Sequence, residues 1–138
     1  MTTTEFLNPA QIAELRARLE QERASVSARI VARRQGLAGA TASRPDDADW
    51  ASDSVDQGLI ARLMDRDTKL LREVDWALSK MDAGSYGLCE ASGEPIEIER
   101  LRARPWSRLS LGAKERRERE EAEHEVERDS AVIEQDVA

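Results

Sequence analysis

The sequence predicts a mainly α-helical protein: a long antiparallel coiled-coil hairpin, a small globular base and a C-terminal helix. Three observations lead to this fold class. Charged residues make up 36% of the 138 residues and aromatic residues only 4%, which is typical of long solvated helices rather than a large compact core. Apolar residues recur at nearly every seventh position in two long stretches. Most of the Gly, Pro and short-loop signals fall within residues 84–113.

The first helix is expected to begin at Asn8, whose side chain can cap the first turn. Pro9 suits the first helical position, and Gln11 completes a box-like capping pattern. Arg44 and Pro45 end the helix because a residue before proline avoids the helical conformation. Between these points an apolar stripe is expected to face a partner helix, and its members are Ile12, Leu15, Leu19, Val26 and Ile30.

The second helix is expected to start between Ala48 and Val55, to run to about Asp82 and to stop at Gly84. Its own apolar stripe consists of Leu59, Leu63, Leu70, Val74, Leu78 and Met81. Neither helix can bury its stripe alone, and the short connection favours antiparallel pairing. Residues 8–82 therefore predict one helical hairpin, a rod of about 40 Å at ~1.5 Å per residue.

Residues 83–113 form the base, which has the frame of a zinc finger without its metal ligands. Two C-x-x-C knuckles would place thiolates at four positions, which are Cys89, Ser92, Ser110 and Ala113. Structural zinc needs four Cys or His ligands, so this set predicts a base that binds no metal. Cys89 is interpreted as a small buried hydrophobe rather than a redox sensor.

The metal-free base needs an apolar core of its own. Its candidates, packed against Leu88, are Ile96, Ile98, Leu101, Trp106, Leu109 and Leu111. Ile96 and Ile98 flank a polar residue, which suggests a short strand or a turn pair. Residues 114–138 predict a charged C-terminal helix with many i,i+4 pairs and a frayed end after about Arg128.

Composition excludes several classes of protein. The net charge of −7 argues against direct sequence-specific DNA binding. One cysteine excludes an internal disulfide and fits a reducing compartment. A signal-peptide pattern is absent, and no apolar run reaches the ~18 residues that span a membrane, so a cytoplasmic protein with no membrane partner is expected. No catalytic constellation is evident, which predicts a non-enzyme without a cofactor. The protein is also expected to be a monomer.

Residues 46–56, at the tip of the hairpin, concentrate negative charge. They contain five aspartates and no Lys or Arg; the aspartates are Asp46, Asp47, Asp49, Asp53 and Asp56. Carboxylates presented at the end of a rod could approach a bound Mg²⁺ or the basic wall of a channel. The alternative is helix-start chemistry, because Asp is a good N-cap and favours the first turn of a helix.

Tip and base together resemble the DksA/TraR family of bacterial RNA polymerase-binding transcription factors. The D-x-x-D-x-A motif of the family's tip is matched by Asp46, Asp49 and Ala51. The YG-x-C-x-x-CG, R-L-x-A-RP and LC-x-x-CK segments of its zinc region are matched, with the cysteine losses noted above, by residues 86–93, 100–105 and 109–114. The resemblance covers about residues 8–128.

This resemblance implies a factor whose hairpin enters the secondary channel of bacterial RNA polymerase. Asp46 and Asp49 would lie near the active-site region, and Ala51 would let the tip pack closely. Arg66 matches a position that helps to hold the rim of the polymerase. The factor would modulate promoter-complex stability and initiation without catalysing a reaction, and the lost ligands would make it independent of zinc.

The family also helps to form a site for the alarmone ppGpp, which links it to the stringent response. The matching positions are Leu70, Glu73, Arg104 and Lys114. Glu73 departs from the family because it replaces a lysine and puts a negative charge where a polyanion would bind. At an effective dielectric constant of about 20 that repulsion costs kilocalories, so a weak response to ppGpp is expected.

Two other functions remain open at this stage. A factor like the Gre proteins also uses an acidic hairpin tip in the same channel, where it stimulates transcript cleavage by helping to hold a second Mg²⁺. A structural coiled-coil adaptor would have no role at the polymerase, and its acidic tip would serve only to cap a helix.

Overall fold

The computed structural model describes residues 1–41 and 47–137, and the side chains of residues 1–36 and 56–133. The chain divides into two units, Met1–Tyr86 and Gly87–Ala138. The first holds a short 3-10 helix, η1 (Thr3–Glu5), and the long helices α1 (Pro9–Thr41) and α2 (Asp47–Ala83). The second holds α3 (Ile98–Ala103) and α4 (Leu111–Val137). The mainly helical fold class is confirmed.

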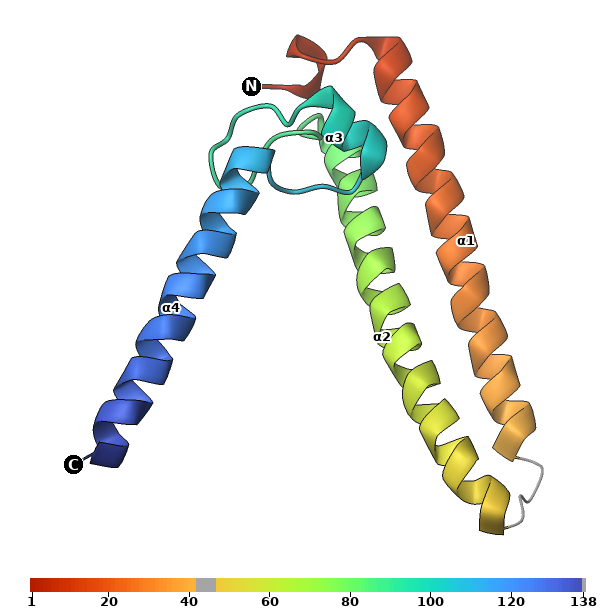
Figure 1. The fold of residues 1–138 in the computed structure, drawn as a ribbon. Coiled ribbons are helices and arrows are strands. Elements are labelled where there is room, and N and C mark those ends of the chain that lie inside the picture. Colours follow the sequence, from red (N-terminus) through yellow and green to blue (C-terminus); the bar gives the residue numbers. More distant parts are fainter. Residues whose placement is uncertain (42–46, 138) are drawn as a thin grey trace. The chain divides into compact units, whose positions relative to one another are not determined.

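Helices α1 and α2 lie side by side and run in opposite directions (Figure 1). The expected start of α1 forms through two reciprocal bonds. The Gln11 N–H donates to Asn8 Oδ1 at 2.7 Å, and the Asn8 N–H donates to Gln11 Oε1 at 2.9 Å. Both amides are therefore satisfied at the helix start, where no intrahelical acceptor is available to them.

The end of α2 is fixed by Gly84, which has a φ of 77°. The Gly84 N–H donates to the carbonyl of Met81 at 3.2 Å, and the Ser85 N–H donates to the carbonyl of Lys80 at 3.0 Å. This pair of bonds is the Schellman motif, which needs a left-handed residue at the position of Gly84. The expected stop signal is thus the residue that reverses the chain.

The hairpin core contains most of the expected apolar stripe. The buried apolar residues of the two helices are Leu15, Leu19, Val26, Ile30, Val74, Ala77 and Met81. Ala77 was not expected, because its small side chain is a weak signal in a stripe of larger residues. Leu59 was expected in the core but is 51% exposed, so the stripe predicted for α2 was wrong at its N-terminal end.

The N-terminal segment packs against the end of α2, a contact that the sequence did not predict. Thr3 is buried; its N–H donates to the carbonyl of Gly84 at 2.9 Å, and its hydroxyl donates to the carbonyl of Tyr86 at 2.9 Å. Tyr86 is itself almost fully buried. The first residues of the chain therefore complete the unit at the end of the hairpin where α2 stops.

The second unit begins with a turn closed by an isolated bridge between Leu88 and Pro95. Ile96 and Leu101 are buried, as expected for the core of the base. Two expectations were wrong. Ile98 begins α3 instead of lying in a strand or turn, and Leu111 is 51% exposed at the start of α4.

Helix α4 is the predicted charged helix. Two i,i+4 ion pairs illustrate this. Lys114 Nζ lies 4.0 Å from Glu118 Oε1, and Arg117 Nε lies 3.3 Å from Glu121 Oε1. The helix continues to Val137, beyond the frayed end expected after Arg128. None of the described helices combines the length and the hydropathy that crossing a bilayer requires.

Candidate functional site

The acidic tip is the first candidate site, and the structure describes it in part. Asp46 lies outside the described residues. Asp49 and Ala51 belong to the first turns of α2, and their side chains lie outside the described set. Asp56 is the first aspartate of the predicted cluster with a described side chain, and it is exposed. The tip motif as a functional site therefore stays a prediction from the sequence.

One face of α2 carries three of the residues that the sequence singled out. Arg66 is exposed, whereas Leu70 and Glu73 are half-buried. These residues are separated by four and three positions, so they follow one another along one face of the helix. Arg66 is therefore available to a partner on the same side of α2 as Leu70 and Glu73.

The other two expected ppGpp positions belong to the second unit. Arg104 is exposed and follows α3, where its N–H donates to the carbonyl of Arg100 at 2.8 Å. Lys114 lies in the first turn of α4, and its N–H donates to the carbonyl of Ser110 at 3.0 Å. The described structure thus brings Leu70 and Glu73 together on one helix and leaves a joint site of all four residues as a prediction.

The four knuckle positions of the base do come together. The Cys89 thiol is hydrogen-bonded to Ser92 and to Ser110. The Ala113 N–H donates to Ser110 Oγ at 3.3 Å. The Gly93 N–H donates to the carbonyl of Cys89 at 2.9 Å, and Gly93 has the positive φ of a tight turn. The backbone of a two-knuckle finger is therefore retained around side chains that differ from its usual thiolates.

The retained frame does not fit zinc. Among the described residues, no group of three or more His, Cys, Asp and Glu side chains could hold a metal ion. Of the other three knuckle positions, Ser92 and Ser110 offer hydroxyls and Ala113 offers no ligand atom. A closed tetrahedral zinc site needs four Cys or His ligands, so these residues lack the chemistry that would hold one.

Cys89 has an unusual environment for a buried thiol. Its side chain is 2% exposed, which agrees with the prediction that Cys89 is buried. Burial raises the pKa of the Cys89 thiol, but hydrogen bonds from the Ser92 and Ser110 side chains and backbone outweigh burial and lower the pKa to about 6. Cys89 is therefore a hydrogen-bonded thiolate at neutral pH, which the description as a small hydrophobe did not include.

This thiolate predicts a pH-dependent stability. The folded pKa of Cys89 is about 6, below the value of about 8.5 for a cysteine in an unfolded chain. A depressed pKa contributes stability that is fully present above the unfolded value and is lost as the pH falls through the folded value. We expect the free energy of unfolding to rise by roughly 1–3 kcal/mol between pH 6 and pH 9. Urea denaturation across this range measures it.

The matched control is Cys89→Ala, which removes the titrating group and leaves the other ionisable residues in place. The rise in stability between pH 6 and pH 9 should be smaller in this variant by the contribution of the thiolate. Equal pH profiles for the two proteins would contradict a stabilised thiolate at Cys89.

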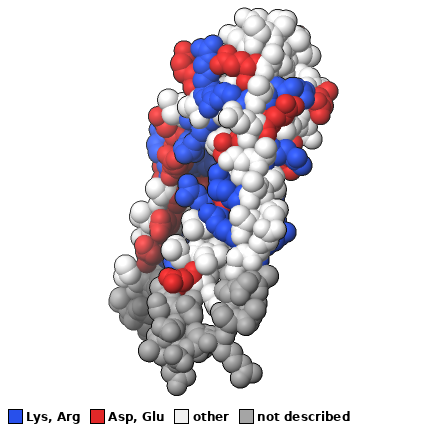
Figure 2. Space-filling view, turned by 90° about the vertical axis from the view of Figure 1, so that its right-hand side faces the viewer, with Lys and Arg blue, Asp and Glu red and all other residues white. Residues whose placement is uncertain are grey.

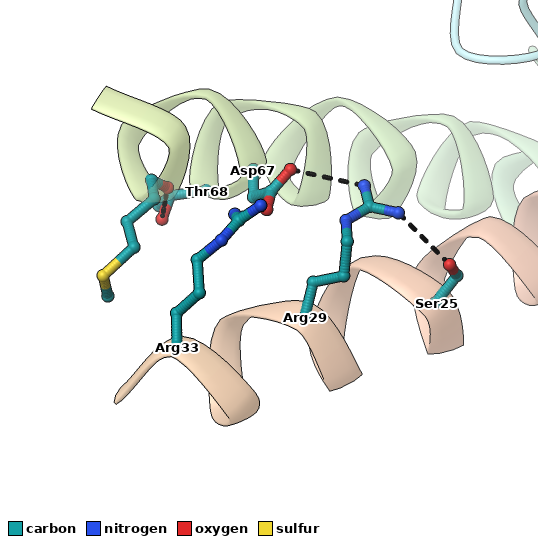
Figure 3. A network of polar contacts seen from close by, with 6 residues as sticks. Ser25, Arg29, Arg33, Asp67 and Thr68 are labelled. Carbon is teal, nitrogen blue, oxygen red and sulfur yellow. Dashed lines mark hydrogen bonds and ion pairs between the residues drawn. The ribbon is translucent and has the colours of Figure 1, made fainter. Parts of the chain in front are cut away.

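Sequence reasoning missed a charged cluster between α1 and α2. Asp67 is buried on α2 and contacts Arg29 and Arg33 of α1 (Figure 3). Burial raises the pKa of Asp67, but hydrogen bonds and charge from Arg29 and Arg33 outweigh it and hold the pKa below its usual value. The signal was a gap in the apolar stripe of α2 between Leu63 and Leu70, at a spacing where a core residue belongs.

Elsewhere the charges of the chain are mixed. On the face drawn in Figure 2, acidic and basic side chains are interspersed over the described residues and do not separate into fields of one sign. The net charge of the whole chain is −7. The described residues on this face form no continuous basic stripe.

Comparisons with known proteins agree with the resemblance. Two family descriptions match: "DnaK suppressor protein DksA, N-terminal domain" over residues 11–81, and "Prokaryotic dksA/traR C4-type zinc finger" over residues 84–119. The second match holds although three of the four cysteines in its name are replaced here. Together the two matches extend over the hairpin and the base.

Relatives with assigned names are also similar over much of the chain. The RNA polymerase-binding transcription factor DksA of Caulobacter vibrioides is 46% identical over 84 residues, which cover 61% of this chain and 59% of the relative. The protein of the same name from Escherichia coli is 32% identical over 110 residues, which cover 80% of this chain and 73% of the relative. The chain thus spans about three fifths of the Caulobacter protein and nearly three quarters of the E. coli one.

A solved structure shares the fold. The transcription factor DksA2 from Pseudomonas aeruginosa superposes with a TM-score of 0.77 and 35% sequence identity, covering 86% of this chain and 92% of that chain. The similarity therefore extends over most of the chain. On the family matches, the relatives and this shared fold, the chain belongs to the DksA/TraR family.

Proposed function

We propose that this protein is a transcription factor that binds RNA polymerase through its secondary channel and modulates the stability of promoter complexes and initiation. The observation that carries the proposal is the D-x-x-D-x-A motif, Asp46 to Ala51, at the connection of a long two-helix hairpin in a member of this family. The relatives from Caulobacter and E. coli are named for binding RNA polymerase. The protein would act as a monomer in the cytoplasm, without binding DNA itself.

The dimensions of the hairpin suit a narrow channel. Helix α1 has 33 residues, which at ~1.5 Å per residue gives a rod of about 50 Å. Two packed helices are narrow enough to enter a pore that a globular domain could not. Asp46 and Asp49 at its end would change the electrostatic environment of the active-site region, while Arg66 would hold the rim of the polymerase.

The proposed activity is independent of zinc. The knuckle frame is held by hydrogen bonds around Cys89 and by backbone bonds such as that from the Glu90 N–H to the carbonyl of Arg108, at 2.9 Å. The side chains of the same two residues form an ion pair, with Arg108 Nη1 3.3 Å from Glu90 Oε1. Activity should therefore survive a chelator that removes structural zinc from proteins with four cysteine ligands.

The test is the lifetime of promoter complexes formed by purified polymerase. Adding the protein should change the lifetime in a concentration-dependent manner, and the change should be the same with and without a zinc chelator. A Gre-type factor added in excess should compete with it if both occupy the secondary channel. No effect on any promoter complex, and no binding to polymerase, would instead support a structural adaptor.

A cleavage assay separates the proposal from a Gre-like activity. Backtracked elongation complexes release a short transcript fragment when an acidic tip helps to hold a second Mg²⁺. We expect this protein to leave the rate of fragment release unchanged. Robust cleavage at concentrations that alter promoter-complex lifetime would favour the Gre-like function.

The charge of Glu73 predicts a weak response to ppGpp. Glu73→Lys replaces a repulsive charge with an attractive one at a proposed ppGpp position, and a change of this kind is worth on the order of 1 kcal/mol or more. We expect the variant to show a several-fold larger change in promoter-complex lifetime on addition of ppGpp. Glu73→Gln, which only removes the repulsion, is the matched control and should lie between the two. An equal ppGpp response in all three proteins would show that ppGpp does not bind next to residue 73.

A further inference from the structure

Asp67 occupies a core position of the coiled coil. The core of α2 follows a heptad spacing of alternating four and three residues through Leu63, Asp67, Leu70, Val74, Ala77 and Met81. Asp67 is 5% exposed, although the positions around it in this series are apolar. A charged residue in such a position lowers stability and can specify which residues pair across a coiled coil.

Two arginines of α1 surround this carboxylate (Figure 3). Arg29 Nη2 lies 3.3 Å from Asp67 Oδ1, and Arg33 Nη1 contacts Asp67 Oδ2. Arg29 also donates to Ser25 Oγ at 3.3 Å, which holds its guanidinium in place. The buried residue of α1 at this level is Ile30, and the partly exposed arginines reach Asp67 from positions 29 and 33 beside it.

Two other charged pairs between the helices distinguish the registers only weakly. Arg16 Nη2 lies 2.8 Å from Asp82 Oδ1, and Arg23 Nε lies 2.6 Å from Asp75 Oδ1. On each helix the two partners are seven residues apart, so a slip of one heptad moves an arginine from one aspartate to the other. These side chains are also largely exposed, and exposed pairs contribute little.

The apolar core has the same ambiguity. Leu19 and Val26 on α1 are seven residues apart, and so are Val74 and Met81 on α2. A slip of one heptad exchanges these residues for one another, but it also brings Glu22 to the place of Leu15 or Arg23 to the place of Ile30. The exchange of these two pairs alone therefore does not distinguish the registers.

A slip would leave Asp67 without a cation in the positions that Arg29 and Arg33 occupy. In one direction Glu22 and Val26 would take those positions, and in the other Gly36 and Ala40 would. The first places a second carboxylate against Asp67, and the second places only small apolar residues there. Either arrangement removes both of the ion pairs that Asp67 makes with α1, which is unfavourable for a buried carboxylate.

We propose that Asp67, together with Arg29 and Arg33, selects the single register in which α1 pairs with α2. A slip of one heptad would shift the helices past each other by about 10 Å at ~1.5 Å per residue. Asp67 is therefore a positioning residue that fixes where the connection between the helices lies. Its consequence for promoter complexes rests on the proposed function, whereas the register itself can be measured independently.

The experiment measures the distance between spin labels on the two helices. The labels are attached to Gln35→Cys on α1 and Ser79→Cys on α2, both exposed positions, in a Cys89→Ala background. The unaltered triad should give one distance population. Replacing all three charges with leucine (Arg29→Leu, Arg33→Leu, Asp67→Leu) should keep or raise the melting temperature and give at least one further population, corresponding to an axial shift of about 10 Å.

The matched control removes an exposed pair from the same interface. Arg23→Leu with Asp75→Leu adds a similar apolar surface but leaves the triad intact, and it should keep the single distance population. If the triple leucine variant does not fold, Asp67→Leu alone provides the same test, because Arg29 and Arg33 are partly exposed and their head groups can reach solvent.

A single unchanged distance population in the triple variant, or in Asp67→Leu where the triple variant does not fold, would overturn the proposal. So would an equal broadening in the Arg23→Leu/Asp75→Leu control. The effect on promoter complexes is measured on the same proteins without labels. A wild-type protein that does not act on polymerase would refute the proposed function, while the distance measurement would still decide the register.

Discussion

Asp49→Asn should abolish most of the effect of this protein on promoter-complex lifetime while its fold and its affinity for polymerase remain. The substitution keeps the size and shape of the side chain and removes one negative charge from the tip motif. Two unit charges 4 Å apart interact by about 4 kcal/mol at an effective dielectric constant near 20. Even a quarter of that energy corresponds to roughly a fivefold change in an equilibrium, so we expect at least a fivefold loss of effect at saturating protein.

The choice of asparagine also separates the two interpretations of the acidic tip. Asp49 lies in the first turn of α2, where a carboxylate contributes about 0.3–1 kcal/mol through the helix dipole, so a tip that serves only the start of α2 should lose little stability and no activity. The measurements are the lifetime of a promoter complex and the melting temperature by circular dichroism. Asp56→Asn, at an exposed aspartate outside the motif, is the control and should behave like the wild type. An unchanged lifetime effect in Asp49→Asn would reduce the acidic tip to a capping role.

Restoring three cysteines to the base should create a zinc site. The variant combines Ser92→Cys, Ser110→Cys and Ala113→Cys, which with Cys89 supply four thiolates in two knuckles. The structure already brings these positions together, since Cys89 bonds to Ser92 and Ser110, and the Ala113 N–H bonds to Ser110. Structural zinc contributes on the order of 10 kcal/mol in small metal-dependent modules, so one tightly bound zinc ion per chain and a higher melting temperature are expected.

Metal analysis of the purified variant, and the visible absorption of its cobalt form, measure this result. The matched control carries the same three substitutions with Cys89→Ala, which leaves three thiolates and an open position. The control should bind zinc far more weakly, and the wild-type protein should contain no stoichiometric zinc. A four-cysteine variant that binds no metal would show that the frame around Cys89 has moved away from the geometry of a zinc finger.

Local signals in the sequence predicted the start of α1 and the end of α2 well. The side chains of Asn8 and Gln11 accept hydrogen bonds from each other's backbone N–H within one turn. Gly84 reverses the chain through backbone hydrogen bonds to the last turn of the same helix. Such interactions depend on a few consecutive residues, which a sequence shows directly. The heptad pattern predicted most of the buried residues of the hairpin for the same reason, because a helix places residues three and four apart on one face.

Interactions between distant residues were harder to predict. Asp67 interrupts the apolar stripe of α2, and nothing local to it shows that Arg29 and Arg33 lie across the interface. The low pKa of Cys89 depends on Ser110, which the sequence places at a lost ligand position without indicating a hydrogen bond. The proposed ppGpp positions likewise belong to two units, so their joint geometry does not follow from the pattern of either one.

The contact between Thr3 and the end of α2 has a consequence for folding during synthesis. The hydroxyl of Thr3 bonds to the carbonyl of Tyr86, 83 residues later in the chain. Helical turns form from neighbouring residues, but this contact closes a long loop, and contacts of high sequence separation form late. On the ribosome, the start of the chain must therefore wait until residues 84–86 have left the exit tunnel. The hairpin unit is then completed in one late step that joins its first residues to its last.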